Sequence, residues 1–149
     1  MDDSLLLRDQ VCFALYSASR AVTSVYRPLL DEHGLTYPQY LVLLALWESD
    51  GRTVSELGSA LRLDSGTLSP LLKRLEAAGQ VEKRRGGADE RRVTVHLTDR
   101  SRDLRDEMRC VPGQIAEAAG LAPDDLRELK RTLDALTESI TAHTEGEHS

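Results

Sequence analysis

Residues 81–98 have the sequence VEKRRGGADERRVTVHLT, and this stretch decides the fold of the chain. Two short runs, 81–85 and 92–97, are rich in β-branched and basic residues and favour strands. The glycines and the Asp between them tolerate the positive φ angles at which a hairpin reverses. We therefore predict a basic hairpin that forms the wing of a winged helix, with Arg84 and Arg85 as candidate DNA contacts.

A helix-turn-helix is predicted just before this hairpin. Thr53 to Glu56 has the capping-box pattern of a helix that continues to Ala60, and Asp64 is placed to cap a second helix, Ser65 to Ala78. Leucines at positions 68, 71, 72 and 75 face inward on the second helix. Its outward face carries hydroxyl groups and cations, which suit a helix in the major groove: Ser65, Thr67, Ser69, Lys73 and Arg74.

The charge distribution favours DNA binding, although the whole chain carries a net charge of −6. Residues 62–92 hold eight Lys or Arg against five Asp or Glu, a local charge of +3 that leaves −9 on the rest. A basic patch collects phosphates while an acidic body keeps the protein dissolved. These residues alone leave two alternatives open: a solvated helix and hairpin that bind nothing, and a winged helix used for protein contacts.

The composition is that of one globular domain, with 149 residues of which 40% are hydrophobic and 30% charged. No apolar run approaches the roughly 20 residues of a membrane-spanning helix. The acidic start, residues 1–4, is unlike a secretory signal, so we expect a cytoplasmic location. Cys12, Cys110 and four scattered histidines lack metal-ligand spacing, so we expect neither a metal nor a cofactor.

Long helices are predicted on both sides of the helix-turn-helix. Ser4 to Glu32 has apolar residues at helical spacing, and a run that begins at Thr36 is apolar nearly all round, as in a buried central helix. A helix from Asp99 toward Ala119 should be bent or interrupted at Pro112-Gly113. A last helix should begin at Pro123 and leave a frayed polar tail at its end, residues 144–149.

The predicted fold class is therefore mainly α with a small β-hairpin wing, a winged helix-turn-helix in a single domain of residues 1–149. Its DNA-binding core spans about residues 36–98. The flanking helices, about residues 4–33 and 99–143, present more apolar surface than a bare winged helix needs. We expect them to form a dimerisation region, because an uncovered apolar stripe seeks a partner.

With this order of elements and the sequence DERRVTVHLT at residues 89–98, the chain resembles the MarR family of bacterial transcriptional regulators. The resemblance covers nearly the whole chain. It implies a homodimer that binds an inverted-repeat operator through paired recognition helices and wings. By position it adds Asp64 to the outward residues of the recognition helix. It also matches Asp89 and Arg91 to the wing's Asp-x-Arg, whose Arg is expected in the minor groove.

A narrower resemblance is to the organic-hydroperoxide-sensing (OhrR-type) branch of that family. It rests on DQVCFALYSASR at residues 9–20, on Tyr26, and on LTYPQY at residues 35–40. The resemblance implies that Cys12 is the peroxide sensor and that Tyr26 and Tyr37 hydrogen-bond to its sulfur. Without the flanking sequence, a small buried hydrophobe would be the commoner role of an isolated Cys.

Spacing along the first predicted helix adds a constraint. Cys12 and Tyr26 are 14 residues apart, so on one continuous helix they share a face but lie about 21 Å apart. A site that contains both takes them from different protomers, at the dimer interface, where thiol chemistry can bias the arrangement of two DNA-reading heads. An N-terminal helical position offers a thiolate some dipole stabilisation, but a helix that starts at Ser4 leaves open whether Cys12 is near enough to the helix start.

The sequence thus predicts a dimeric repressor, not an enzyme, that releases its operator when an organic hydroperoxide oxidises Cys12 to a sulfenic acid. The resemblance leaves the next step open between a disulfide with Cys110, a candidate resolving thiol in the partner chain, and capping by a small thiol. One alternative replaces the redox switch by a phenolic or other small ligand. Another, of a different class, is a thiol peroxidase that carries a winged helix.

Overall fold

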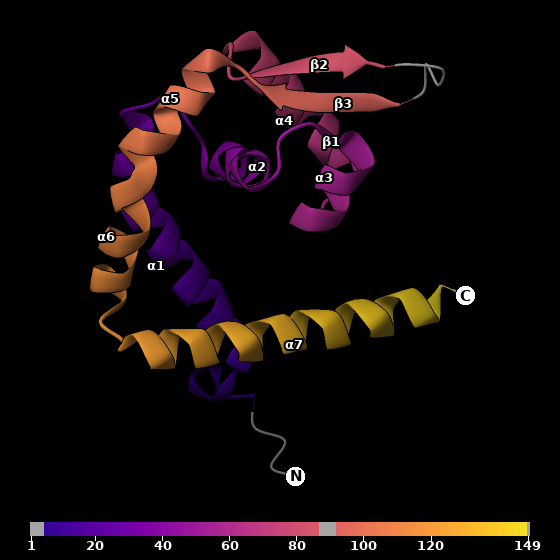
Figure 1. Cartoon of the computed structure of the whole chain (residues 1–149). Coiled ribbons are helices and arrows are strands. Elements are labelled where there is room, and N and C mark those ends of the chain that lie inside the picture. Colours follow the sequence, from indigo (N-terminus) through magenta and orange to yellow (C-terminus); the bar gives the residue numbers. More distant parts are fainter. Residues whose placement is uncertain (1–4, 87–91, 149) are drawn as a thin grey trace. The chain divides into compact units, whose positions relative to one another are not determined.

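Helix α2 (Tyr37–Glu48) forms the centre of the core in the computed structural model, where Figure 1 shows it end-on. Thr36 caps the helix, because its hydroxyl accepts the Gln39 N–H at 3.4 Å while the Gln39 side chain accepts the Thr36 N–H at 2.9 Å. Three of its apolar side chains have no exposed surface: Val42, Leu43 and Leu46. The predicted buried central helix is confirmed.

The structure describes residues 5–86 and 92–148. These residues are mostly helical with a small antiparallel sheet, which confirms the predicted fold class. Residues 1–111 and 112–149 form two separate compact units. Within the described ranges, no helix is both long and apolar enough to cross a bilayer.

The helix-turn-helix consists of α3 (Val54–Leu61) and α4 (Ser65–Ala77). The side chains of Thr53 and Asp64 cap these helices by accepting backbone N–H groups of the first turn, at 3.0 and 2.7 Å. All four predicted inward leucines of α4 are buried, with at most 7% of their surface exposed. The turn between the helices depends on Arg62, which has a left-handed φ of 56°. Sequence patterns did not predict that feature, because this conformation is uncommon for residues other than Gly.

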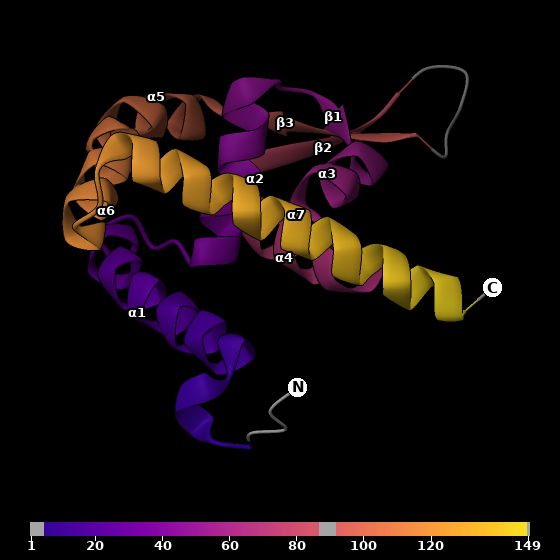
Figure 2. The same ribbon diagram turned by 90° about the horizontal axis from the view of Figure 1, so that it is seen from below.

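The sheet has the order β1-β3-β2, with β1 (Arg52–Thr53), β2 (Val81–Arg85) and β3 (Val93–Leu97). The β2–β3 pair confirms the predicted hairpin, and its strands reach past α3 in both views (Figures 1 and 2). The third strand, β1, was not predicted. It has two residues and pairs with β3 more than 40 positions later, so no local pattern marks it.

The first helix starts later than predicted. A single turn of 3-10 helix (Leu7–Asp9) is followed by extended backbone at Gln10, and helix α1 runs Val11–Asp31. The prediction of a continuous helix from Ser4 is therefore wrong, and Ser4 itself lies outside the described residues. Leu5 is 92% exposed, so no burial stabilises a helical turn at this end of the chain.

The interruption predicted near Pro112 is confirmed. Helix α5 (Asp99–Glu107) passes into a 3-10 turn (Met108–Cys110) before α6 (Val111–Ala119). Pro112 has no N–H to donate, and its ring clashes with the carbonyl four residues earlier, that of Met108. The regular helix accordingly stops at the residue before Met108.

The second unit contains α7 (Pro123–Glu147), which begins at Pro123 as predicted. The helix continues past residue 143, so the expected frayed tail from residue 144 is wrong over residues 144–147. Local contacts stabilise this last turn. The Thr144 hydroxyl donates to the Ile140 carbonyl at 2.9 Å, and the side chains of His143 and Glu147 lie 3.4 Å apart.

Candidate functional site

The outward face of α4 is the first part of the candidate site. Its N-terminal half carries short polar side chains and its C-terminal half carries cations, all of them exposed as predicted: Ser65, Thr67, Ser69, Lys73 and Arg74. Short side chains allow a helix to approach base edges closely, and the cations can reach phosphates. This face has the chemistry of a recognition helix.

Asp64, predicted to lie on or near this face, has a local structural role. The backbone N–H of Thr67, at 2.7 Å from Asp64 Oδ1, is the main cause that holds the pKa of the Asp64 carboxyl below its usual range. The carboxylate therefore stays ionised near neutral pH and anchors the first turn of α4. Its contact with DNA remains a prediction.

The wing contributes two of the predicted cations to the described residues. Arg84 and Arg85 are both exposed on β2, and Arg84 Nε lies 3.0 Å from a carboxylate oxygen of Glu82. That ion pair offsets part of the positive charge, so Arg85 is the better placed of the two for a phosphate. Asp89 and Arg91, predicted to contact DNA at the tip, lie outside the described residues.

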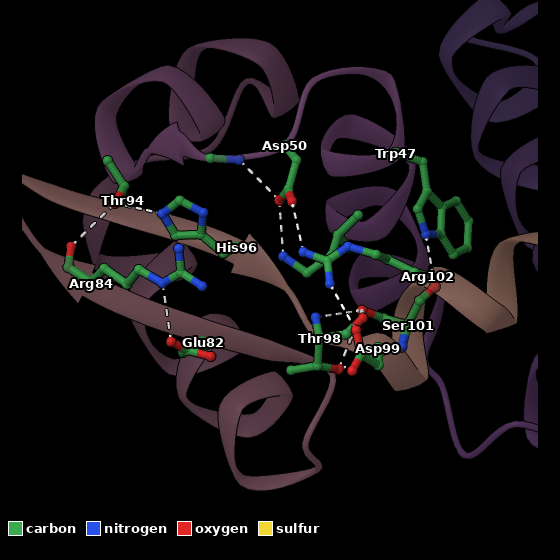
Figure 3. Close-up of polar contacts among 12 residues, drawn as sticks. Trp47, Asp50, Glu82, Arg84, Thr94, His96, Thr98, Asp99, Ser101 and Arg102 are labelled. Atoms are coloured by element: carbon green, nitrogen blue, oxygen red, sulfur yellow. Dashed lines mark hydrogen bonds and ion pairs between the residues drawn. The ribbon is translucent and has the colours of Figure 1, made fainter.

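Asp50 joins the wing to the rest of the core (Figure 3), a role that the sequence analysis missed. Its Oδ1 accepts the Leu97 N–H of β3 at 2.8 Å, and its Oδ2 lies 3.4 Å from the guanidinium of Arg102 on α5. On α2, Trp47 Nε1 donates to the Ser101 carbonyl at 2.9 Å. The C-terminal end of α2 is thus tied to both β3 and α5, and the Asp50-Gly51 turn was the available sequence signal.

Three tyrosines gather where α1 meets the start of α2. The rings of Tyr26 and Tyr37 have centroids 4.8 Å apart, and Tyr40 lies 5.8 Å from Tyr26 and 6.3 Å from Tyr37. The structure therefore brings together the two tyrosines predicted to serve the sensor. It adds Tyr40, which the sequence analysis missed although it follows Tyr37 by three residues on the same helix face.

The environment of these rings keeps their hydroxyl groups protonated. Burial, followed by the proximity of Tyr37 and Tyr40, raises the pKa of Tyr26 to about 12, and burial raises the pKa of Tyr37 and of Tyr40 as well. A neutral phenol can donate a hydrogen bond, whereas a phenolate cannot. The cluster therefore offers O–H donors at physiological pH, which suits an anionic sulfur or oxygen.

We expect Tyr26 to ionise last among the three clustered tyrosines. Its pKa in the folded protein is above its ordinary value of 10.0, so the stabilisation it contributes is present below about pH 10 and is lost between about pH 10 and 12. An ultraviolet titration of phenolate formation should show this late phase in the native protein, and Tyr26→Phe should remove it. A single phase near pH 10 for every tyrosine would contradict the assignment.

A cavity of about 290 Å³ opens beside the tyrosines. Its lining comes from the C-terminal half of α1 and the start of α2: Thr23, Tyr26, Arg27, Leu30, Asp31, Leu35, Thr36, Tyr37 and Pro38. The volume is at the lower end of the roughly 300–1,000 Å³ range of small-molecule sites. It can hold a peroxide or a side chain from another protomer.

Cys12 lies away from this cluster. It is the second residue of α1 and is exposed, and the 14 residues of helix to Tyr26 span about 21 Å. The sequence left open whether Cys12 lies near enough to the helix start for dipole stabilisation, and the structure places it there because α1 begins at Val11. The N–H groups of the first turn have no acceptor within the helix and stabilise an anion beside them.

The N-terminal half of α1 presents apolar side chains to solvent around Cys12. Val11 is 70% exposed, Phe13 45% and Tyr16 60%, and the Arg20 guanidinium lies over the Tyr16 ring at 5.6 Å. Several large apolar side chains exposed on one helix are typical of a protein interface.

Cys110, the candidate resolving thiol, is also exposed. It ends the 3-10 turn after α5, and its Sγ lies 3.7 Å from the Glu107 carbonyl. Its role as a resolving thiol remains a prediction.

Comparisons with known proteins point to regulators of transcription. The model of the transcriptional regulator SarA/Rot family matches residues 24–108. The regulator TtmR of Methylorubrum extorquens is 49% identical over 95% of this chain and 72% of its own length. The organic hydroperoxide resistance transcriptional regulator of Bacillus subtilis is 44% identical over 93% of this chain and 94% of its own length.

A similar fold occurs in AbfR of Staphylococcus epidermidis. Its reduced form bound to DNA has a TM-score of 0.75 and is 35% identical, over 91% of this chain and 94% of that one. AbfR also has an overoxidised form bound to DNA and a disulfide form, with TM-scores of 0.74 and 0.62.

Proposed function

Since this chain belongs to the MarR family of winged-helix, DNA-binding transcriptional regulators, we propose that it is a repressor controlled by oxidation of Cys12. Organic hydroperoxides are the proposed oxidants, and the oxidised form has low affinity for its operator. The name of the Bacillus subtilis regulator and the disulfide form of AbfR support a thiol switch, whereas the overoxidised form of AbfR is bound to DNA, so we assign low affinity to the sulfenic acid and the products it forms with a thiol. A repressor works where the chromosome is, so we place it in the cytoplasm.

One observation carries the redox assignment: the phenols gather around a cavity while the thiol lies about 21 Å away on the same helix. Tyr26 and Tyr37 of one protomer can therefore meet only the Cys12 of a partner. The exposed apolar side chains beside Cys12 supply the surface for such a partner. We propose a homodimer in which α1 forms part of the interface and each sensor site contains residues of both chains.

The proposed chemistry uses the Cys12 sulfur of one protomer and the phenol groups of the other. The Cys12 thiolate attacks one peroxide oxygen, so an S–O bond forms while the O–O bond breaks, and the departing alkoxide takes a proton to become an alcohol. The phenol O–H groups of Tyr26 and Tyr37 hydrogen-bond to the sulfur and stabilise the charge on the departing oxygen.

DNA binding is assigned to α4 and the wing. In a homodimer two α4 helices enter major grooves about one helical turn, roughly 34 Å, apart, which requires an inverted-repeat operator. The exposed residues of α4 would contact bases and phosphates, and Arg85 would contact the backbone beside them. Asp89 and Arg91 keep their proposed role at the wing tip.

The cavity beside the tyrosines also favours a second candidate function. Its 290 Å³ volume, two phenol groups and Arg27 could hold a small phenolic ligand that changes operator affinity without thiol chemistry. The redox switch requires Cys12, whereas a switch controlled by a phenolic ligand does not.

A gel shift with an inverted-repeat duplex from the region upstream of the gene tests the proposed function. We expect the reduced protein to bind with an affinity that falls steeply with salt, and cumene hydroperoxide to lower that affinity by about 5- to 150-fold. Dithiothreitol should restore binding if the product is a disulfide. Binding that is unaffected by hydroperoxide would contradict the redox assignment, and binding that does not depend on salt would contradict the DNA interface.

A further inference from the structure

A second cavity, of about 420 Å³, lies within the unit of residues 1–111 and shares no lining residue with the tyrosine cavity. It is bounded by the segment after α1, by the turn between α4 and β2, and by one face of α5. Its lining residues are Glu32, His33, Gly34, Gln80, Arg100, Leu104 and Glu107. Nothing in the proposed redox or DNA-binding role uses this cavity.

Gln80 places an unused hydrogen-bonding group at this cavity. The residue is 2% exposed, and its side-chain Oε1 accepts no hydrogen bond from any described residue. Its backbone is held on both sides, because its N–H donates to the Leu75 carbonyl at 2.9 Å and its carbonyl accepts the Thr98 N–H at 3.4 Å. That oxygen is closed to solvent, so a ligand reaches it when the Gln80 side chain turns toward the cavity. A buried acceptor without a donor is costly, so a ligand that donates to it then gains free energy.

The α5 wall of the cavity carries opposite charges at its two ends. Arg100, Leu104 and Glu107 follow one another at helical spacing, so they share a face and the backbone of Arg100 lies about 10 Å from that of Glu107. Leu104, between them, is 6% exposed. Such a wall suits a ligand with an anion at one end, a cation at the other and an apolar stem between.

The polar groups of the other walls extend this pattern. Arg100 Nη1 donates to the Ala78 carbonyl at 3.2 Å, which fixes the guanidinium beside the turn that carries Gln80. At the opposite end His33 Nδ1 lies 3.5 Å from Glu107, and Glu32 adds a second carboxylate. The end of the cavity that holds Arg100 therefore also holds Gln80. The end that holds Glu107 has a second carboxylate, that of Glu32.

We infer that this cavity binds a basic α-amino acid. The ligand carboxylate pairs with Arg100, its α-ammonium donates to Gln80 Oε1, and its side-chain ammonium pairs with Glu107 and Glu32. The aliphatic stem covers Leu104. Arg100 also donates to the carbonyl of Ala78, the residue that follows α4, so the partner of the ligand carboxylate is tied to the end of that helix.

Isothermal titration calorimetry of the full-length protein with L-lysine tests this site. Three analogues each lack one recognised group: norleucine lacks the side-chain ammonium, 6-aminohexanoate the α-ammonium, and cadaverine the carboxylate. We expect L-lysine to bind and each analogue to bind at least about tenfold more weakly, since a charge-assisted hydrogen bond is lost each time. No heat with L-lysine, or equal affinity for norleucine, would overturn the proposal.

Variants of the cavity residues show which of them contact L-lysine. Arg100→Gln, Glu107→Gln and Gln80→Leu should each weaken L-lysine binding by about tenfold or more. Arg105→Gln, an exposed Arg on the same helix outside the cavity, is the matched control and should bind as the unmodified protein does. If Gln80→Leu fails to fold, the affinities of Arg100→Gln and Glu107→Gln for L-lysine test the site. Wild-type affinity in both, or a crystal structure with only water in the cavity at saturating L-lysine, would refute the site.

Discussion

Replacing Cys12 by Ser is expected to leave operator binding within about twofold of the original value and to abolish the response to organic hydroperoxide. The side chain is exposed at the start of α1, so the exchange of sulfur for oxygen should not disturb the core. A hydroxyl at neutral pH is not a nucleophile toward peroxide. The release of about 5- to 150-fold expected for the unmodified protein should therefore disappear.

The measurement is operator affinity by fluorescence anisotropy, before and after cumene hydroperoxide, at one fixed salt concentration. A Cys12→Ser variant that still releases DNA in hydroperoxide would refute Cys12 as the sensor. If it kept that response and released DNA with a phenolic compound as well, the ligand-controlled function would replace the redox function.

Cys110→Ser is the matched control, because it also removes one exposed thiol. If Cys110 of the partner resolves the sulfenic acid, oxidation of the unmodified protein gives a covalent dimer on a non-reducing gel, and Cys110→Ser does not. If a small thiol caps Cys12 instead, the gel shows a monomer and mass spectrometry shows the added thiol. In both cases Cys110→Ser should bind DNA normally in the reduced state.

Leu43→Ala is expected to lower the free energy of unfolding by about 2–5 kcal/mol, the range for truncating a fully buried Leu. Leu43 has no exposed surface on α2, the helix that forms the centre of the core. The loss combines the transfer free energy of the removed carbons with the cost of the cavity left behind. Urea unfolding followed by circular dichroism, at equal protein concentrations, measures it.

The neighbouring Leu44 provides a control on the same helix. It is 39% exposed, so Leu44→Ala should cost less than about 1 kcal/mol. Equal losses for the two variants would mean that α2 is not the buried centre of the fold. A smaller loss for Leu43→Ala than for Leu44→Ala would mean that the buried face of α2 is wrongly assigned.

The tyrosine cluster shows how far sequence reasoning reaches into the candidate site. A family resemblance predicted Tyr26 and Tyr37 as sensor residues, and in the structure the centroids of their rings lie 4.8 Å apart. Tyr40 and the raised pKa values of all three could not be predicted, because both depend on how α1 packs against α2. The resemblance named two of the phenols, whereas their burial extends the pH range over which they stay protonated.

Helix capping and hairpin formation are local events, so the sequence by itself determined them. The hydroxyl of Thr36 and the carboxylate of Asp64 select helix starts within four residues, and the basic run at residues 81–85 predicts its strand from its own composition. The outward face of α4 follows from the spacing of its leucines.

Contacts between distant segments decided the rest. Strand β1 exists only because β3 lies beside it, and the cavity at Gln80 exists because three separate segments meet there. Tertiary structure also set the start of α1, since exposed leucines before Gln10 gain no burial that would stabilise another helical turn. That late start places Cys12 in the first turn of its helix, a position that residue spacing alone had left open.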